Sequence, residues 1–276
     1  MTQKSNSLNE IQHKELSIQL SLNGLSFCIL NVDTNTITYL EHFSTSKKQS
    51  PEDVLDQLKN CFETESALAE SFSKITVIHN NEWSTLVPKA LFNEDNLVDY
   101  LKLNIKILKT DFITFDTIAI NDSVNVYLPF VNINNYIYDK FGSFTYKHAS
   151  TVLVEAILNT EANANETKLY INVSESDFQV VVVKNGDLLL YNTFKYDTPA
   201  DFIYYILFTA EQLQLNPETI KTVLLGNITE NDELYTVVYK YIRYISFGNV
   251  KNAYNYSETP LSSYSDFTLI KSLQCE

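Results

Sequence analysis

Glycine is scarce in this sequence, because only 5 of the 276 residues are Gly. An average protein contains about 7% glycine, which would be roughly 19 residues at this length. Glycine allows the positive-φ turns and the close backbone approach on which phosphate-cradling loops depend. An AT-rich genome explains the shortage equally well, but it does not exempt a site that physically requires Gly. No Gly-rich nucleotide loop can be formed from residues that stand alone: Gly24, Gly142, Gly186, Gly226 and Gly248.

Positive charge is also limited. Arg243 is the only arginine, and 20 Lys+Arg residues stand against 34 Asp+Glu, which gives a net charge of −14. Nucleic acids and anionic membrane surfaces are bound by clusters of Lys and Arg, so neither is an expected partner. A single Arg also leaves little room for bidentate phosphate recognition.

Cysteine pairs and long apolar runs are the remaining absences. Cys28, Cys61 and Cys275 are odd in number and form no CxxC, so we expect reduced thiols rather than disulfides or a zinc site. The N-terminus lacks the apolar core of a signal peptide, and no run approaches the roughly 18 residues of a membrane span. We therefore expect a cytoplasmic protein with a disordered N-terminus over residues 1–14.

The first half of the sequence predicts a meander of three strands followed by helices and further strands. Alternating apolar and polar residues indicate the strands, and Asn23-Gly24 and Asp33-Thr34-Asn35 indicate the turns. Ser50-Pro51 followed by acidic residues predicts the start of the first helix. The expected strands are 16–19, 25–30, 37–43, 75–78, 112–120 and 124–128, with an apolar piece at 83–88. The expected helices are 51–62, 94–103 and 132–141.

The second half repeats this pattern. The segment LSIQLS at 16–21 corresponds to LYINVS at 169–174, and each is followed by a hairpin, a third strand and a helix that begins at Pro. Asn185-Gly186 is the strongest hairpin signal in the chain. The expected strands are 169–173, 178–183, 187–194 and 222–225, and the expected helices begin at Thr198-Pro199 and cover 232–244.

A β-β-β-α-β-α unit that occurs twice indicates duplicated domains. We place the first domain at residues 15–142 and the second at residues 143–276. The polar segment 161–166 ends a helix inside the second domain and is too short for a long interdomain linker.

The duplicated unit resembles the actin-like ATPase fold, which is ribonuclease H-like and is shared by actin, Hsp70 and sugar kinases. Within that superfamily it resembles the pilus-assembly proteins in particular. The chain more specifically resembles DUF3822, a Bacteroidetes family of unknown function. This resemblance covers nearly the whole chain and implies an α/β fold of two such domains, each a mixed five-stranded sheet with flanking helices. It implies no established activity. Four short apolar segments in fixed order carry it: 16–27, 86–92, 125–129 and 267–275.

The resemblance also implies a phosphate site that this sequence does not supply. The ATPases hold phosphates in two hairpins that carry Asp-x-Gly, where Asp positions Mg²⁺ and Gly admits the phosphate. The matching place in the second domain has Asn172 for the acid and Ser174 for the glycine. The Gly pair of the adenosine motif is reduced to Gly226 followed by Asn227, and Gly24 is typical of a plain hairpin turn. We expect no catalytic residue, no metal and no bound cofactor.

Other catalytic patterns are weaker. Asp111 and Asp116 flank a strand and would form an acid–base pair only if that strand bends, and Ser84 lacks the Gly-x-Ser-x-Gly elbow of hydrolases. Glu175 and Asp177 are expected to form a solvated acidic turn. No metal-ligand spacing relates the four histidines, which are His13, His42, His79 and His148. His79 follows a buried strand and could either approach a cleft or be an ordinary, partly buried histidine.

Aromatic residues are abundant, with 18 Tyr and 16 Phe. Tyrosine is enriched at protein interfaces because it buries a large area at low entropy cost. Core filling explains most of these residues, but one group in the C-terminal half could border a contact surface: Tyr235, Tyr239, Tyr241, Tyr244, Tyr254 and Tyr256.

These observations favour a cytoplasmic, degenerate actin-like module that has no catalytic activity and binds or scaffolds an unknown protein partner. The interdomain cleft and the tyrosine-rich region are the expected places of contact, and a homodimer through the two meanders is a further hypothesis. The alternative is a nucleotide-binding ATPase or kinase-like protein with atypical phosphate loops, for which ATP and Mg²⁺ would be cofactors. The fold alone does not decide, because one fold hosts many functions.

Overall fold

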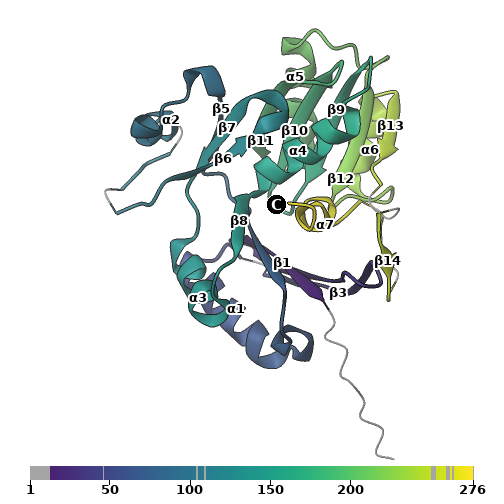
Figure 1. Cartoon of the computed structure of the whole chain (residues 1–276). Helices are drawn as coiled ribbons and strands as arrows, with labels where there is room; N and C mark the ends of the chain where they lie inside the picture. The colour runs from purple at the N-terminus through teal and green to yellow at the C-terminus, as the bar shows by residue number, and fades with distance from the viewer. Residues whose placement is uncertain are drawn as a thin grey trace, which may run out of the picture.

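The computed structural model describes residues 13–275, except residues 46, 104, 109, 250–252, 259–261 and 263. Two sheets carry helices on their outer sides, two further helices lie between the sheets, and a small third sheet extends from the first half (Figure 1). Most of the predicted N-terminal disorder, residues 1–12, lies outside the described residues, and residue 14 already belongs to the first strand.

The first sheet begins with the predicted antiparallel meander. Its strands are β1 (Lys14–Ser21), β2 (Gly24–Asn31) and β3 (Thr36–Ser44), and Ser26 of β2 lies opposite both Gln19 of β1 and His42 of β3. β4 (Lys74–His79) pairs in parallel with β1, and β8 (Thr145–His148) pairs in parallel with β4. β14 (Asn255–Tyr256) adds a sixth strand beside β3, so the order is β14-β3-β2-β1-β4-β8.

The helices of the first half follow from local signals. α1 (Pro51–Thr64) starts at a capping box in which Ser50 and Asp53 bond each other's backbone N–H, and the short η1 (Ser66–Ala69) follows it. α1 and α3 (Val131–Phe141) share one apolar cluster with the meander, so they cover the outer face of the first sheet.

An insert between β4 and α3 forms the third sheet, which the sequence did not predict as a separate unit. Its strands β5 (Ser84–Pro88), β7 (Ser123–Tyr127) and β6 (Thr114–Ile118) lie in that order and are antiparallel. The helical pieces of the insert are η2 (Lys89–Leu91), η3 (Glu94–Asn96), α2 (Leu97–Leu101) and η4 (Ala119–Asn121).

The second sheet has the five strands expected, in the order β11-β10-β9-β12-β13. Asn185 and Gly186 both have positive φ in the turn between β10 and β11, as an Asn-Gly hairpin requires. The elements are β9 (Thr167–Val173), β10 (Asp177–Lys184), β11 (Asp187–Lys195), α5 (Pro199–Gln212), β12 (Lys221–Gly226), α6 (Glu233–Tyr241) and β13 (Tyr244–Phe247).

Two details differ from the sequence-based expectation. The predicted helix over 232–244 ends at Tyr241, because the backbone of Ile242 is extended and β13 begins at Tyr244. The first sheet has six strands instead of five, because β14 returns from the C-terminal part of the chain. The division at residue 142 stays a prediction, and β8, which lies beyond that residue, pairs within the first sheet.

Two central helices join the halves. α4 (Ala149–Glu161) is buried on nearly all sides and packs against α7 (Phe267–Ser272) (Figure 1). One apolar cluster includes residues of β2, α4, β9, β10, β12 and α7, so the inner faces of both sheets share a core. A separate cluster under α5 and α6 forms the core on the outer face of the second sheet.

Candidate functional site

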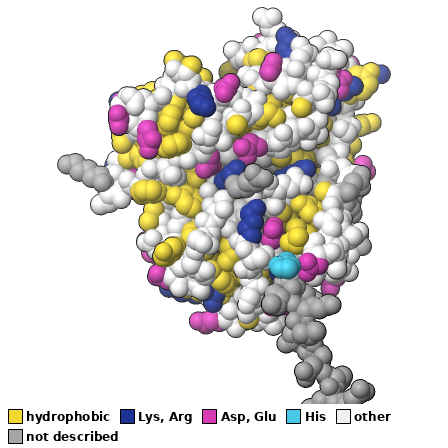
Figure 2. Space-filling view, viewed as in Figure 1, with side chains coloured by type: hydrophobic (Ala, Val, Ile, Leu, Met, Phe, Trp, Pro, Cys, Tyr) yellow, Lys and Arg dark blue, Asp and Glu magenta, His cyan; other side chains and the backbone are white. Residues whose placement is uncertain are grey.

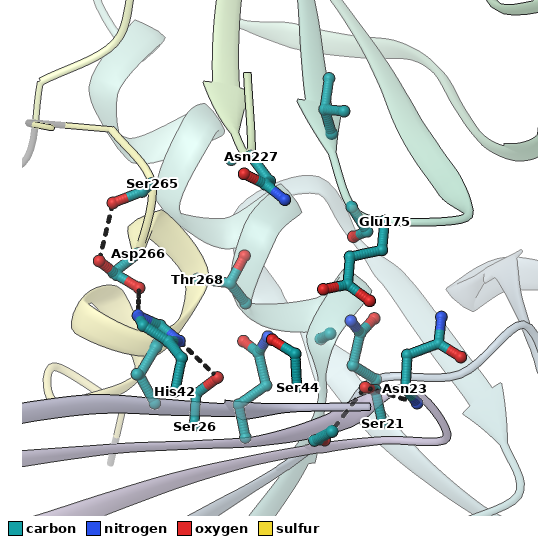
Figure 3. A pocket seen from close by; sticks show the side chains of 18 of the residues that line it. Ser21, Asn23, Ser26, His42, Ser44, Glu175, Asn227, Ser265, Asp266 and Thr268 are labelled. Carbon is teal, nitrogen blue, oxygen red and sulfur yellow. Dashed lines mark hydrogen bonds and ion pairs between the residues drawn. The ribbon is translucent and has the colours of Figure 1, made fainter. Parts of the chain in front are cut away.

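A cleft of about 1170 Å³ lies between the two halves. The turn that joins β1 to β2 and the turn that joins β9 to β10 both line it, as do β3 and the segments that follow β4 and β12. The duplication explains this arrangement, because equivalent ends of the two meanders face each other across one space. In Figure 3, Ser26, His42 and Ser44 come from the first half, while Glu175 and Asn227 come from the second.

The three degenerate positions predicted from sequence all line this cleft. The side-chain N–H of Asn172 donates to Oε1 of Gln179 at 2.7 Å. The backbone N–H of Ser174 donates to the carbonyl oxygen of Asp177 at 2.9 Å and closes the β9–β10 turn. Gly226 has φ +79°, and a Cβ there would lie 2.2 Å from the carbonyl oxygen of Val173. Gly226 is therefore required where β12 ends against β9.

The two hairpin tips touch each other. Nδ2 of Asn23 donates to Oγ of Ser176 at 2.9 Å, which joins the β1–β2 turn to the β9–β10 turn across the cleft. Gly24 has φ +149°, and a Cβ at this position would lie 2.4 Å from the carbonyl oxygen of Phe43. Gly24 thus serves the turn and its close approach to β3, in agreement with the prediction of a plain hairpin turn.

The cleft is acidic, and its only lysines among the described lining residues are engaged. Glu82 pairs with Lys48 at 3.5 Å and with Lys195 of the second half. Partial burial opposes ionisation of Glu82, but the two ammonium groups hold its pKa below the usual range. Both positive charges are thereby balanced in part, whereas seven carboxylates line the cleft: Glu41, Glu82, Glu175, Asp177, Glu230, Glu258 and Asp266.

Asp177 is less solvated than the sequence suggested. Burial, with a smaller contribution from Glu82, raises the pKa of Asp177 to about 6, although Lys195 and Lys48 act in the opposite direction. One of its oxygens accepts a hydrogen bond from Nε2 of Gln179 at 3.1 Å. Glu175 in the same turn is exposed, so the predicted solvated acidic turn holds for Glu175 and is wrong for Asp177.

A hydrogen-bonded chain of side chains lies on the first-half wall of the cleft. Nδ1 of His42 is 2.8 Å from Oγ of Ser26, and Nε2 of His42 is 2.8 Å from Oδ1 of Asp266. Oγ of Ser265 donates to the other oxygen of Asp266 at 2.8 Å, and Figure 3 shows the chain from Ser265 to Ser26. This chain could not be predicted from the sequence, because positions 26, 42 and 266 belong to no shared motif.

The comparisons with known proteins decide the family. The family model described as "Protein of unknown function (DUF3822)" matches residues 3–245. This chain belongs to the DUF3822 family. No curated protein shows significant similarity to it.

Solved structures show that this DUF3822 protein has an actin-like ATPase fold. A Bacteroides thetaiotaomicron protein of that fold and of unknown function is 22% identical, with a TM-score of 0.75 over 96% of this chain and 97% of the other. The type IV pilus biogenesis complex PilM–PilN gives 12% identity and a TM-score of 0.56 over 96% and 98%. The ethanolamine utilization protein EutJ from Carboxydothermus hydrogenoformans gives 5% and 0.50 over 94% and 88%.

His79 and His148 are both buried in this DUF3822 protein. His79 is fully buried at the end of β4, where burial lowers its pKa to about 4 and Phe130 N–H donates to its Nδ1 at 3.2 Å. His148 caps α4 by accepting from the backbone N–H of Ser150, and burial lowers its pKa to about 3. His79 therefore has a packing role and does not reach the cleft lining.

The hypothetical acid–base pair of Asp111 and Asp116 does not form. Asp111 accepts from the backbone N–H of Leu108 at 2.7 Å. Asp116 is half-buried and accepts from Tyr127 Oη at 3.0 Å, from the His148 backbone N–H at 2.8 Å and from a threonine hydroxyl of α4. Each carboxylate is thus engaged separately. Ser84 lies in β5 opposite Tyr127, outside the cleft lining.

The remaining predictions concern metals, cysteines and membranes. Within the described part of the chain, no group of three or more His, Cys, Asp or Glu residues could hold a metal ion. Cys28, Cys61 and Cys275 are free and buried. None of the helices in the described ranges is both long enough and apolar enough to span a membrane.

The tyrosine tract divides into three groups, and Tyr235 by itself packs against the apolar cluster under α5 and α6. Tyr254 and Tyr256 pack against the shared central core, whereas Tyr239, Tyr241 and Tyr244 are exposed on α6 and around the start of β13. The insert carries a second exposed apolar group that the sequence did not predict, and Figure 2 shows hydrophobic side chains gathered over it at the upper left. Its exposed residues are Leu91, Val98, Leu103, Leu108, Phe112 and Ile120.

Proposed function

We propose that this DUF3822 protein is a degenerate actin-like binding or scaffolding module, located in the cytoplasm, that performs no nucleotide chemistry. The hydrogen bond between Asn23 and Ser176 carries the proposal, because it joins the two hairpin tips between which the ATPases hold phosphate. The packing of Gly226 against Val173 adds support, since this glycine serves the sheet itself.

The electrostatics of the cleft favour the same conclusion. ATP carries several negative charges, and seven carboxylates line the space that it would have to enter. Both lysines are already paired with Glu82, and one Arg in the chain, Arg243, pairs with Glu218 away from the cleft at 3.9 Å. Like charges placed together cost several kcal/mol, so a polyanion is disfavoured.

Exposed apolar side chains support a protein partner. Scattered surface apolar residues are normal, but a group on one small unit marks a contact site. The insert supplies one such group, with Leu91 and Leu103 at 71% and 85% exposure, and Tyr239 on α6 belongs to the other. A protein complex, PilM–PilN, is among the solved structures of similar fold. Dimerisation through the two meanders stays a further hypothesis.

Thermal unfolding with nucleotide tests the proposal. A ligand at a hundredfold excess over its Kd stabilises a protein by about 2.7 kcal/mol, which would raise the melting temperature of a chain of this size by roughly 5–10 °C. We expect millimolar Mg-ATP to leave the melting temperature within about 1 °C of the value with MgCl2 alone. A clear rise would contradict the proposal and favour the ATPase or kinase-like alternative, with ATP and Mg²⁺ as cofactors.

A pull-down from native cytoplasm tests the partner. We expect Leu91→Ser combined with Leu103→Ser to reduce capture of a specific protein, while Leu189→Ser, an exposed apolar residue on β11, does not. Equal capture by all three forms would contradict the role of the insert. Light scattering tests dimerisation, because a strict monomer excludes it.

A further inference from the structure

Gln19, Ser26 and His42 form a row across three neighbouring strands. Ser26 of β2 is the register partner of Gln19 in β1 and of His42 in β3. Directly opposed residues in antiparallel strands have Cβ atoms about 4.5–5.5 Å apart on the same face of the sheet. All three residues line the cleft, so a hydroxyl there stands between an imidazole and a carboxamide.

The imidazole of His42 is held in one orientation. Its Nε2 lies 2.8 Å from Oδ1 of Asp266, whose side chain is only 6% exposed and whose second oxygen accepts from Ser265. A carboxylate acceptor at Nε2 favours the tautomer with its proton on that nitrogen. The lone pair of Nδ1 is then directed at Oγ of Ser26, 2.8 Å away. A positioned serine, a base and a carboxylate that orients the base are the arrangement used for nucleophilic catalysis.

The carboxamide of Gln19 completes the constellation. Its Oε1 is shielded from solvent and has no hydrogen-bond partner in the structure. Side-chain amide N–H groups of Asn and Gln stabilise the oxyanion of acyl-transfer transition states. Gln19 lies directly opposite Ser26 and lines the same cleft, which places its carboxamide beside the serine hydroxyl.

We propose that Ser26 is a nucleophile that is acylated by a carboxylic ester entering the cleft, with His42 as general base, Gln19 as oxyanion donor and Asp266 as a positioning residue. Oγ of Ser26 forms a bond to the acyl carbon while its proton moves to Nδ1 of His42. The bond from the acyl carbon to the leaving oxygen breaks, and His42 gives that oxygen its proton. Water then attacks the acyl-serine in the same way, releasing the acid and restoring Ser26.

The lining of the cleft defines the class of ester. Seven carboxylates stand against two paired lysines, so neutral or cationic acyl donors are favoured over anionic ones. This inference goes beyond the proposed binding role and does not depend on it. A failed acylation leaves the nucleotide test unaffected, and a positive nucleotide test leaves the acylation unaffected.

Incubation of the full chain with p-nitrophenyl acetate tests the proposal. We expect p-nitrophenolate release and an acetyl group on Ser26, found by peptide mass mapping. Ser26→Ala should abolish the acetyl-serine, and His42→Gln should lower the acylation rate by about 100-fold, as for loss of a general base. Gln19→Ala should lower it by about 100-fold or more, the range for loss of an oxyanion donor. Ser84→Ala, at a serine outside the cleft lining, should leave the rate unchanged.

The pH profile tests the positioning role of Asp266. The hydrogen bond to Asp266, with smaller help from Glu41 and against partial burial, raises the pKa of His42 above its ordinary 6.5. The base must be neutral, so the wild-type rate should rise with pH through that raised pKa. Asp266→Asn should lower the rate and move the midpoint to lower pH, which a purely structural tie between β3 and α7 would not do.

The alternative is that these hydrogen bonds only attach α7 to the first sheet. Release of p-nitrophenolate by the wild-type protein that is no faster than release by Ser26→Ala, or acylation that His42→Gln leaves unchanged, would establish that alternative and overturn the proposal. If Asp266→Asn fails to fold, the His42→Gln rate and the wild-type pH profile still decide. A melting temperature is measured for each variant, and rates are compared only between variants that are folded at the assay temperature, which separates loss of chemistry from loss of structure.

Discussion

Asp177→Asn is expected to stabilise the protein at neutral pH. The pKa of Asp177 is raised from 3.8 to about 6, so it is higher by about 2, and a difference of 1 in pKa corresponds to about 1.36 kcal/mol. The gain in the free energy of unfolding is therefore at most about 3 kcal/mol. Because the carboxylate is only partly buried, solvent screening reduces the gain that we expect from Asp177→Asn to about 1–2 kcal/mol. Asn keeps an oxygen that can accept from Gln179.

The sign of this effect follows from proton binding. With its raised pKa, folded Asp177 binds more protons than the unfolded chain between about pH 4 and pH 6, so wild-type stability falls as pH rises through that range. Asp177→Asn cannot ionise, so its advantage should be full at pH 8 and should shrink as the pH approaches 4. Urea denaturation followed by the fluorescence of Trp83, the single tryptophan, measures both values.

Glu175→Gln is the matched control, because Glu175 is exposed in the same turn. Its unfolding free energy should stay within about 0.5 kcal/mol of wild type at both pH values. The reasoning is refuted if Asp177→Asn is no more stable than wild type at pH 8. It is also refuted if the advantage is equal at pH 4 and pH 8.

Three further predictions concern stability and reactivity. Gly226→Ala should lower the free energy of unfolding by about 3 kcal/mol or more, because its Cβ would lie 2.2 Å from the Val173 oxygen. Gly142→Ala has open space around its Cβ and should cost only the strain of positive φ, about 1–2 kcal/mol. Equal losses for the two variants in urea denaturation would contradict this. Asp116→Ala removes a half-buried acceptor of three hydrogen bonds and should cost about 2–4 kcal/mol by the same assay. A loss below about 1 kcal/mol would contradict this. Burial raises the pKa of Cys28 far above its ordinary value, so its thiol should resist Ellman's reagent until the protein unfolds, and rapid reaction of Cys28 in the native state would contradict that.

Much of the fold could be predicted because its signals are local. The helices expected to begin at Ser50-Pro51 and Thr198-Pro199 form there, each after a three-stranded meander and each with a capping box at its start. Asn185 and Gly186 adopt the positive φ that their hairpin requires. The resemblance to actin-like ATPases placed Asn172 and Ser174 at one of two phosphate hairpins, and both residues line the cleft between the halves.

Other parts could not be predicted because their causes are tertiary. β8 is a four-residue strand whose pairing depends on β4 alone, and α4 is buried on nearly every side, so its sequence shows little helical periodicity. β14 consists of two residues that pair only because the chain returns to β3. The contact of His42 with Asp266 joins positions 224 residues apart in the sequence, and no spacing rule reaches that far.

The return of the C-terminal segment to the first sheet determines when this protein can fold during synthesis. β14 supplies the outermost strand beside β3, and the hydroxyl of Ser272 in α7 forms a buried hydrogen bond with that of Ser17 in β1. Domains usually fold as units while the ribosome is still making later residues. Here the N-terminal sheet lacks an edge strand and one of its covering helices until residues 255–272 have emerged. Part of the apolar face of the first half must therefore stay open until that segment has been made.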